Sequence, residues 1–483
     1  MTDKGGAFIA NDWREGQGAL LPAPYEGGAG LRGATADDVA EAFAAAREAF
    51  PGWARTPLAE RVDSLNRFKA ILEARKADLA RLISEETGKP LWEGEAEAGA
   101  MIGKIGLSIQ AYDARTGETT LETAFGAARL SHRPHGVMLV LGPYNFPGHL
   151  PNGHIAPALL AGNTVVFKPS EFTPRTGAAL VDALAATDLP SGVVNLVQGG
   201  REIGQAAVSD ARVDGVLFTG SAAAGAAIHK AFGGRPEVIL ALEMVGNNPL
   251  LVWDAEDAQA AARLALHSAY VTAGQRCSCA RRLIVAEGAA GDAVVEALAA
   301  DIQTVQVGAW DAQPAPFIGR LINADAAERV LAAQADRLAR GGRAIRLAQP
   351  LALGPAFLSP GLIDVTGVET PDEEVFGPLL HVLRTPSFEA GLEAANATRF
   401  GLAAGLISDD PGLWVRFQAE IRAGVVNWNR PTTGASSALP FGGPGASGNA
   451  RPSAYYAADY CAWPMAMQTA ERPQRLGGPG LAP

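Results

Sequence analysis

A cysteine between glycine and serine residues is the first residue whose type could do covalent chemistry. Cys277 stands in the run Gly-Gln-Arg-Cys-Ser-Cys, and Cys279 follows two positions later. A thiolate is a strong nucleophile, although the thiol needs a lowered pKa to form it near neutrality. Free cysteines are also common core residues, and a Cys-x-Cys run without a nearby Cys/His pair is a poor metal site. The run therefore allows a nucleophile or a core thiol, and we expect no metal.

Two further segments offer a general base and an uncharged hydrogen-bond donor. Glu243 stands near the end of the apolar run Glu-Val-Ile-Leu-Ala-Leu-Glu-Met, where a carboxylate is costly to bury unless it is partnered or protonated. Such surroundings raise a carboxyl pKa and suit a general base, while a partnered structural carboxylate is an equal alternative. Asn145, in Pro-Tyr-Asn-Phe-Pro, follows an apolar run and could donate to an oxyanion. A simple turn residue is the other interpretation.

Residues at two more strand ends could bind a phosphate-bearing ligand. Lys168 and Glu171 follow one apolar run, while Gly220, Ser221 and Gly225 lead from another into a predicted helix. A helix N-terminus attracts anions such as a pyrophosphate. Each segment is weak by itself, because a strand–Gly–Ser–helix connection is often only a turn and a lysine on a loop is often solvated.

The elements that must position these residues alternate between strands and helices. From Gly136 onward, short runs rich in Val, Ile and Leu alternate with helical stretches, which indicates buried parallel strands in a doubly wound α/β sheet. A second such region follows it. Ahead of both, helical patterns cover 35–50 and 58–86. With 483 residues the chain is too long for one ordinary core, and two or three domains are expected.

The composition of the chain limits the kinds of binding partner and compartment that we expect. A formal net charge of -11 argues against nucleic acid or an anionic membrane as the main partner. Three cysteines in so long a chain argue against a disulfide framework and favour a reducing compartment. The first twenty residues lack a signal-peptide pattern, and no apolar run approaches the ~18–20 residues that cross a membrane. We expect a cytoplasmic protein that acts on a small molecule, with neither nucleic acid nor membrane as partner.

Taken in order, these segments resemble the aldehyde dehydrogenase superfamily from about residue 8 to residue 467. The run Glu-Glu-Val-Phe-Gly-Pro, which contains Glu374 and Phe376, completes the pattern. The resemblance implies an α/β fold with a doubly wound NAD-binding domain, an α/β catalytic domain and a small β oligomerisation flap that joins a homodimer or homotetramer. The expected boundaries are 1–115 with 135–245, then 246–445, and 116–134 with 446–475.

The resemblance also implies oxidation of a small-molecule aldehyde through a cysteine thioester, with NAD as cofactor. Cys277 attacks the aldehyde, the Asn145 side chain and the Cys277 N–H hold the oxyanion, and Glu243 activates the hydrolytic water. The implied cofactor contacts are Lys168 and Glu171 at the adenosine ribose, Gly220, Ser221 and Gly225 near the pyrophosphate, and Glu374 and Phe376 at the nicotinamide ribose and ring. Glu171 disfavours a 2′-phosphate, which favours NAD over NADP.

Within the superfamily, four long segments most resemble the succinylglutamate semialdehyde dehydrogenases of arginine catabolism: GPYNFPGHLPNGHIAPALLAGNT, NLVQGGRE, VTAGQRCSCARRL and GASGNARPSAYYAADYCAWPMA. The implied substrate, N-succinyl-L-glutamate 5-semialdehyde, carries two carboxylates, for which arginine is the usual partner. Arg276, Arg430 and Arg451 are the candidates. Val245 departs from the family pattern, where glycine stands. A broad-specificity aldehyde dehydrogenase and a catalytically impaired NAD-binding member therefore remain alternatives.

Overall fold

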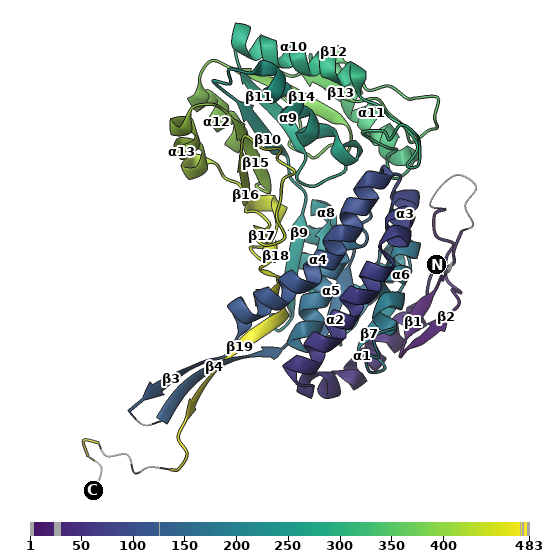
Figure 1. Ribbon diagram of the computed structural model, residues 1–483, viewed down its shortest axis with the longest axis vertical. Helices are drawn as coiled ribbons and strands as arrows, with labels where there is room; N and C mark the ends of the chain where they lie inside the picture. The colour runs from purple at the N-terminus through teal and green to yellow at the C-terminus, as the bar shows by residue number, and fades with distance from the viewer. Residues whose placement is uncertain (1–3, 24–29, 125, 474, 476–477, 481–483) are drawn as a thin grey trace.

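The computed structural model describes residues 4–23, 30–124, 126–473, 475 and 478–480 (Figure 1). Two α/β units, each built on a seven-stranded sheet, lie one beyond the other along the long axis, and a three-stranded sheet projects from the first unit. The α/β fold class predicted from the sequence is confirmed. The domain boundaries remain a prediction, and parts of them (1–3, 24–29, 125 and 474) lie outside the described residues.

The first sheet has the strand order β2-β1-β7-β6-β5-β8-β9. Its strands are β1 (Ala7–Ile9), β2 (Asp12–Arg14), β5 (Val137–Leu141), β6 (Thr164–Lys168), β7 (Val194–Val197), β8 (Gly215–Gly220) and β9 (Ile239–Met244). Its helices are α1 (Ala36–Arg55), α2 (Leu58–Ala74), α3 (Lys76–Thr87), α4 (Leu91–Thr116), α5 (His149–Ala161), α6 (Pro174–Ala185), α7 (Arg201–Ser209) and α8 (Ala222–Ala231).

The topology of this sheet indicates at which edge a ligand would bind. Strands β5 to β9 are parallel, and the chain runs from β5 outward to β6 and β7 before it returns to place β8 and β9 on the other side of β5. The strand order therefore reverses between β5 and β8, and ligands of open α/β sheets bind at the carboxyl ends of strands at such a point. The predicted site residues after β5, β6, β8 and β9 all stand at this edge.

Two helix predictions differ from the structure. The helix predicted over 35–50 begins as expected with Thr35 and Asp38 in a capping box, but α1 continues through Pro51 to Arg55. The single helix predicted over 58–86 is wrong. It is two helices, α2 and α3, because Arg75 between them leaves the helical conformation (φ -101°, ψ 10°).

The second sheet has the order β12-β13-β14-β11-β10-β15-β16. Its strands are β10 (Asn248–Val252), β11 (Ala280–Ala286), β12 (Arg343–Arg346), β13 (Gly361–Asp364), β14 (Leu379–Thr385), β15 (Ala403–Ile407) and β16 (Val425–Trp428). Its helices are α9 (Ala258–Tyr270), the 3₁₀ turn η1 (Val271–Gly274), α10 (Ala289–Thr304), α11 (Ala324–Ala339), α12 (Phe388–Asn396) and α13 (Pro411–Glu420).

The end of the chain returns to the first unit. It contains β17 (Pro440–Phe441), the 3₁₀ turn η2 (Gly445–Ser447), β18 (Ser453–Ala454), α14 (Ala457–Cys461) and β19 (Ala462–Thr469). Gly448 pairs with Glu243 at the outer edge of β9, and the Asn449 side chain bonds the backbone of Leu240 and Leu242. Helix α14 packs on α4 and α5. The C-terminal segment thus covers the open edge of the first sheet.

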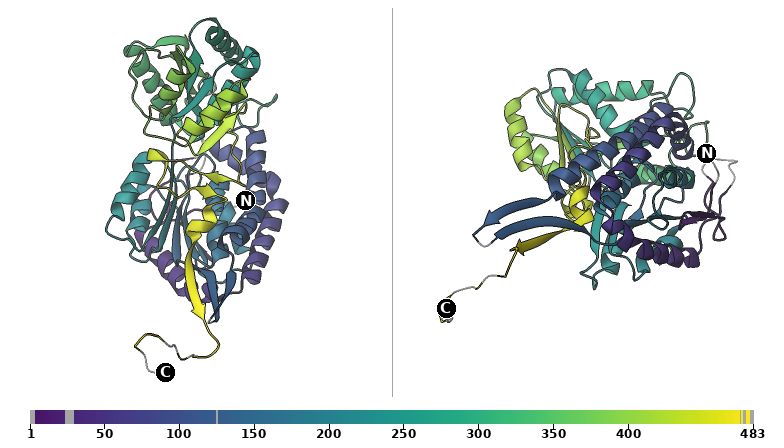
Figure 2. Two further views of the ribbon diagram at one scale, coloured as in Figure 1. Left: turned by 90° about the vertical axis from the view of Figure 1, so that its left-hand side faces the viewer. Right: turned by 60° about the horizontal axis from the view of Figure 1, so that its bottom comes forward.

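The projecting sheet consists of β3 (Thr119–Thr123), β4 (Gly126–Pro134) and β19, all antiparallel (Figure 2). Leu121, Leu130 and Trp463 on these strands are exposed. Within the described residues, no helix is both long enough and apolar enough to cross a membrane.

Candidate active site

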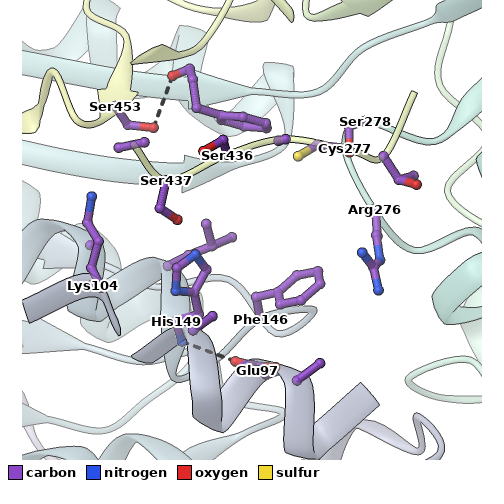
Figure 3. A pocket seen from close by; sticks show the side chains of 18 of the residues that line it. Glu97, Lys104, Phe146, His149, Arg276, Cys277, Ser278, Ser436, Ser437 and Ser453 are labelled. Atoms are coloured by element: carbon purple, nitrogen blue, oxygen red, sulfur yellow. Dashed lines mark hydrogen bonds between the residues drawn. The ribbon is translucent and has the colours of Figure 1, made fainter. Parts of the chain in front are cut away.

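A cavity of about 270 Å³ lies where the two units meet. The first unit contributes residues of α4, α5 and the loop after β5, and the second contributes the segment around Cys277. Loop residues between 433 and 454 close the remaining side. Figure 3 shows Cys277 and Arg276 on one side of this cavity and Lys104 on the other, with His149 and Phe146 between them.

Cys277 is half-buried and lies at this cavity, whereas Cys279 is fully buried. The Asn248 side chain holds the segment by donating to the carbonyls of Cys277 (2.7 Å) and Cys279 (2.8 Å). Burial of the sulfur raises the pKa of the Cys277 thiol well above its usual range, and the nearby carboxyl groups of Glu243 and Glu374 raise it further. The thiol is therefore neutral in this arrangement, and a proton must leave before it can attack.

The turn that presents Cys277 is strained. Thr272 (φ 58°) and Ala273 (φ 52°) adopt the left-handed conformation that side chains with a Cβ disfavour. Gly274 (φ 71°) continues the turn, and a Cβ at that position would lie 2.1 Å from the Gly377 carbonyl oxygen. Three consecutive residues in this conformation require hydrogen bonds from other parts of the chain to stabilise them.

The buried carboxylate of Glu93, on α4, supplies those partners. Its Oε1 accepts from the Thr272 N–H (3.1 Å), and its Oε2 accepts from the Thr272 hydroxyl and from Arg276 Nη2 (3.0 Å). Arg276 Nε also donates to the Thr272 hydroxyl (2.7 Å). Sequence patterns did not indicate Glu93, because its partners lie about 180 positions away along the chain.

The loop of Asn145 is held by a buried ion pair. Lys89 Nζ donates to Glu97 Oε2 (2.7 Å) and to the Asn145 carbonyl (2.6 Å). Glu97 Oε1 in turn accepts from the N–H groups of Gly148 and His149. The Asn145 amide donates one hydrogen to the Gln275 carbonyl (2.9 Å), two residues before the cysteine. An amide nitrogen carries two hydrogens, and the second is available to a ligand.

Glu243 lies beside the thiol, at the end of β9. Its side chain is buried, and Oε1 has no hydrogen-bond partner in the described part of the chain. Burial raises the pKa of Glu243 well above its usual range. The next residue but one, Val245, is half-buried and outside the left-handed region, and its carbonyl accepts from the Ser447 hydroxyl (2.8 Å). The backbone therefore accommodates valine without strain at this position.

Two predicted cofactor residues stand at the carboxyl end of β6. Lys168 is buried, and its Nζ donates to the Pro169 carbonyl (2.9 Å) and lies 3.9 Å from Glu171 Oε2. Burial lowers the pKa of Lys168, and the Glu171 carboxylate opposes that shift. The Glu171 side chain remains partly exposed, where its carboxylate can accept hydrogen bonds from ribose hydroxyls.

Helix α8 begins at the same edge. Ser221 follows Gly220 and caps α8 by accepting from the Ala224 N–H (3.2 Å), and the other N–H groups of the first turn lack intrahelical acceptors. A Cβ at Gly225 would lie 2.3 Å from the Met244 sulfur, so Gly225 allows α8 to pack on β9. The start of α8, Lys168 and Glu171 thus stand at the carboxyl edge of one sheet, where open α/β sheets bind their ligands.

The predicted nicotinamide residues are organised by an arginine. Arg281, buried on β11, donates to Glu374 Oε1 (2.9 Å) and lies over the Phe376 ring, 5.5 Å from its centroid. The Phe376 ring meets Tyr144 edge to face. Burial raises the pKa of Glu374 to about 7, and Arg281 opposes that shift. Arg281 was missed from the sequence because nothing near it signals a buried cation.

The geometry agrees with comparisons against known proteins. Residues 13–464 match the Aldehyde dehydrogenase family. The chain belongs to the aldehyde dehydrogenase family. The N-succinylglutamate 5-semialdehyde dehydrogenase 2 of Caulobacter vibrioides is 59% identical to this chain, over 96% of each protein.

Solved aldehyde dehydrogenases share the fold. An aldehyde dehydrogenase of Mycobacterium tuberculosis complexed with NAD+ has a TM-score of 0.89 at 28% identity and covers 98% of this chain and 100% of its own. The NADP-dependent glyceraldehyde-3-phosphate dehydrogenase of Bacillus halodurans, complexed with NADP, has a TM-score of 0.88 at 26% identity, covering 96% of this chain and 99% of its own. Aldehyde dehydrogenases thus use NAD or NADP, and the resemblance read from the sequence is confirmed.

The three arginines suggested for the substrate differ in position. Arg276 lines the cavity of this aldehyde dehydrogenase but is paired with Glu93. Arg430 and Arg451 are exposed and do not line the cavity. Lys104, which the sequence did not indicate, does line it. No group of three His, Cys, Asp or Glu side chains suited to a metal ion occurs within the described residues.

Proposed function

We propose that the protein oxidises N-succinyl-L-glutamate 5-semialdehyde to N-succinyl-L-glutamate with NAD, in arginine catabolism. The observation that carries the proposal is a cysteine that lines the cavity and is close enough to the buried carboxyl group of Glu243 for that group to raise its pKa, in a chain 59% identical to an N-succinylglutamate 5-semialdehyde dehydrogenase. Hydroxyl groups of Ser436, Ser437 and Ser453 also line the cavity and suit a substrate with several polar groups.

The nucleophile is Cys277. After its thiol loses a proton, Sγ attacks the aldehyde carbon and the carbonyl oxygen becomes an oxyanion. The second Asn145 amide hydrogen and the Cys277 N–H are the donors for that oxyanion, and one such donor stabilises the transition state by ~3 kcal/mol. The Lys89–Glu97 pair holds the Asn145 loop, so the donor does not have to reorganise during the reaction.

When bound, NAD supplies the acceptor for the hydride that leaves the aldehyde carbon. The carbon then remains on Cys277 as a thioester. Glu243 takes a proton from a water molecule, the water oxygen attacks the thioester carbon, and the carboxylic acid leaves as Sγ is released. Because burial raises the pKa of Glu243, its proton uptake falls nearer neutral pH, where a general base is most effective.

The cofactor would be held by residues of both units. Lys168 and Glu171 suit the adenosine ribose, and the start of α8 at Gly220 and Ser221 suits the pyrophosphate. Glu374 and Phe376 suit the nicotinamide ribose and ring. The Glu171 carboxylate repels a 2′-phosphate, which supports NAD over NADP.

We also infer a cytoplasmic homodimer or homotetramer. Its contacts would include the projecting sheet of β3, β4 and β19, which exposes apolar side chains far from the body of the chain. Sedimentation of the purified protein tests this inference, and a monomer at micromolar concentration would contradict it.

A substrate panel tests the proposed function. NADH formation at 340 nm is measured for N-succinylglutamate 5-semialdehyde, succinate semialdehyde and butanal, each with NAD and with NADP. We expect kcat/KM to be at least about 100-fold higher for the first substrate than for butanal, and higher with NAD. Similar values for all aldehydes would indicate a broad-specificity enzyme, and no NADH with any of them would indicate an impaired family member.

A further inference from the structure

Lys104 is a buried cation of the cavity that no described residue compensates. It lies on α4, its side chain is buried, and its Nζ has no hydrogen-bond partner in the part of the chain that the structure describes. The side-chain stem passes Gly153 of α5, where an added Cβ would lie 3.6 Å from Lys104 Cε. Figure 3 places Lys104 at the end of the cavity away from Arg276 and Cys277.

The other charges at the cavity are already paired. Arg276 bonds Glu93, and Glu97 bonds Lys89. An anion that entered next to Arg276 would therefore meet a guanidinium whose charge is largely neutralised. Lys104 has no such carboxylate partner among the residues that the structure describes.

The remaining titratable neighbours of Lys104 are neutral near pH 7. Burial lowers the pKa of His149 to about 4 and that of His154 to about 3. Burial also raises the pKa of the Cys461 thiol on α14, and that of the Tyr460 hydroxyl. The pKa of Lys104 itself is lowered by burial to about 8, so the ammonium form still prevails at neutral pH. A buried, charged and unpaired ammonium is costly unless a ligand supplies the counter-charge.

The proposed substrate supplies such a charge at the right end. Its aldehyde carbon, which must reach Cys277, and its succinyl carboxylate stand at opposite ends of the molecule. A substrate whose aldehyde lies against the sulfur therefore extends its far carboxylate toward the end of the cavity that holds Lys104.

We propose that Lys104 binds the terminal succinyl carboxylate of the substrate and selects N-succinyl over shorter N-acyl semialdehydes. This inference rests on the proposed function. It replaces the three arginines as the group that recognises the far end of the substrate. The lysine makes one charge-assisted hydrogen bond, or two if its ammonium bridges both carboxylate oxygens.

Two substrates that differ only in that carboxylate test the proposal. N-succinylglutamate and N-acetylglutamate 5-semialdehydes share the aldehyde and the α-carboxylate, and the acetyl compound lacks the terminal group. Steady-state kinetics are measured for the wild type, Lys104→Met and Lys104→Gln. Lys76→Met, an exposed lysine at the start of α3, is the control.

We expect both Lys104 variants to lower kcat/KM for the succinyl substrate by about 10- to 100-fold, mostly through KM. The loss for the acetyl substrate should be at least ten times smaller. Calorimetric affinity for the product N-succinylglutamate should fall in parallel, and Lys76→Met should match the wild type. Thermal midpoints of the Lys104 variants should equal or exceed that of the wild type, because an unpaired buried charge has been removed.

The outcomes separate the two proposals. If the wild type prefers the succinyl substrate to butanal but the Lys104 variants lose both N-acyl substrates equally, the assignment of Lys104 is overturned and the proposed function stands. Unchanged kinetics in both variants would also overturn it. A wild type without that preference rejects the proposed function, and the Lys104 inference with it.

Discussion

Replacing Glu93 by glutamine should misplace the nucleophile, because the Glu93 carboxylate bonds Thr272 and Arg276 in the turn that presents Cys277. The carboxylate accepts three hydrogen bonds, two from Thr272 and one from Arg276. A glutamine keeps one oxygen for the Thr272 N–H but points an NH2 group toward the guanidinium. The Arg276 bond is lost, and one donor is left facing another.

The magnitude follows from the local energetics. A hydrogen bond to a charged group contributes about 1.5–3 kcal/mol, and breaking a partly buried pair leaves the other charge uncompensated. The left-handed Thr272 and Ala273 each store on the order of 1–3 kcal/mol, which the Glu93 bonds offset. Without them we expect this turn to relax. A shift of the sulfur by about 1 Å would lower kcat/KM by roughly 10²-fold.

The assay combines kcat/KM, thermal unfolding and the rate at which iodoacetamide alkylates Cys277. Glu95→Gln is the matched control, because Glu95 lies on the same helix with an exposed side chain. The Glu93→Gln protein should lose about 2–4 kcal/mol of stability in the second unit and should alkylate at a changed rate. A variant with wild-type kinetics, alkylation and stability would refute the argument that Glu93 holds the turn.

Four other outcomes are expected. Cys277→Ala should abolish oxidation while Cys279→Ala keeps most of it, and NADH formation by the first variant would reject the assignment. Glu243→Gln should give a pre-steady-state burst of NADH and then turnover that is slower by about 10²–10⁴-fold; loss of the burst would place Glu243 elsewhere in the mechanism. Burial raises the pKa of Glu243 in the folded protein above its value in the unfolded chain. The contribution of its protonated form to stability is therefore complete below the unfolded pKa and is lost as the pH rises through the folded pKa. In urea titrations, Glu243→Gln should lose less stability between acidic and alkaline pH than the wild type. Val245→Gly should raise kcat by freeing space two residues after Glu243, and the melting temperature should change little because the valine side chain is only half-buried. An unchanged or lower kcat would defeat the idea that Val245 crowds the site.

The fold could be predicted because buried parallel strands have a recognisable sequence pattern. Strands such as β5 and β8 are buried on both faces, so they read as short continuous apolar runs between helical stretches. The same pattern predicted that the polar residues after each run lie together at one edge of the sheet. Helix ends were less predictable, as the break at Arg75 shows, since no proline or glycine marks it.

The supporting residues of the site could not be predicted in this way. Glu93, Glu97 and Lys104 lie on α4, a helix rich in alanine and glycine whose sequence carries no local pattern for buried charge. Their partners come from segments far along the chain, and pairing at that distance is decided by tertiary packing. Arg430 was predicted as a substrate ligand but is exposed and does not line the cavity. The position of a loop near a pocket does not determine whether a side chain on that loop points into the pocket.

The cover that the C-terminal segment places on β9 has a consequence for synthesis on the ribosome. On the outer side of β9, Gly448 pairs with Glu243, and the Asn449 side chain bonds the backbone of Leu242 and Leu240. The first α/β unit is thus translated early yet cannot complete its sheet until almost the whole chain has emerged. At a translation rate of roughly 5–20 residues per second, the outer edge of strand β9 stays unpaired for about 10–40 seconds. An open strand edge pairs readily with other chains, so nascent chains stalled before residue 448 should aggregate or recruit chaperones more than chains stalled after α14.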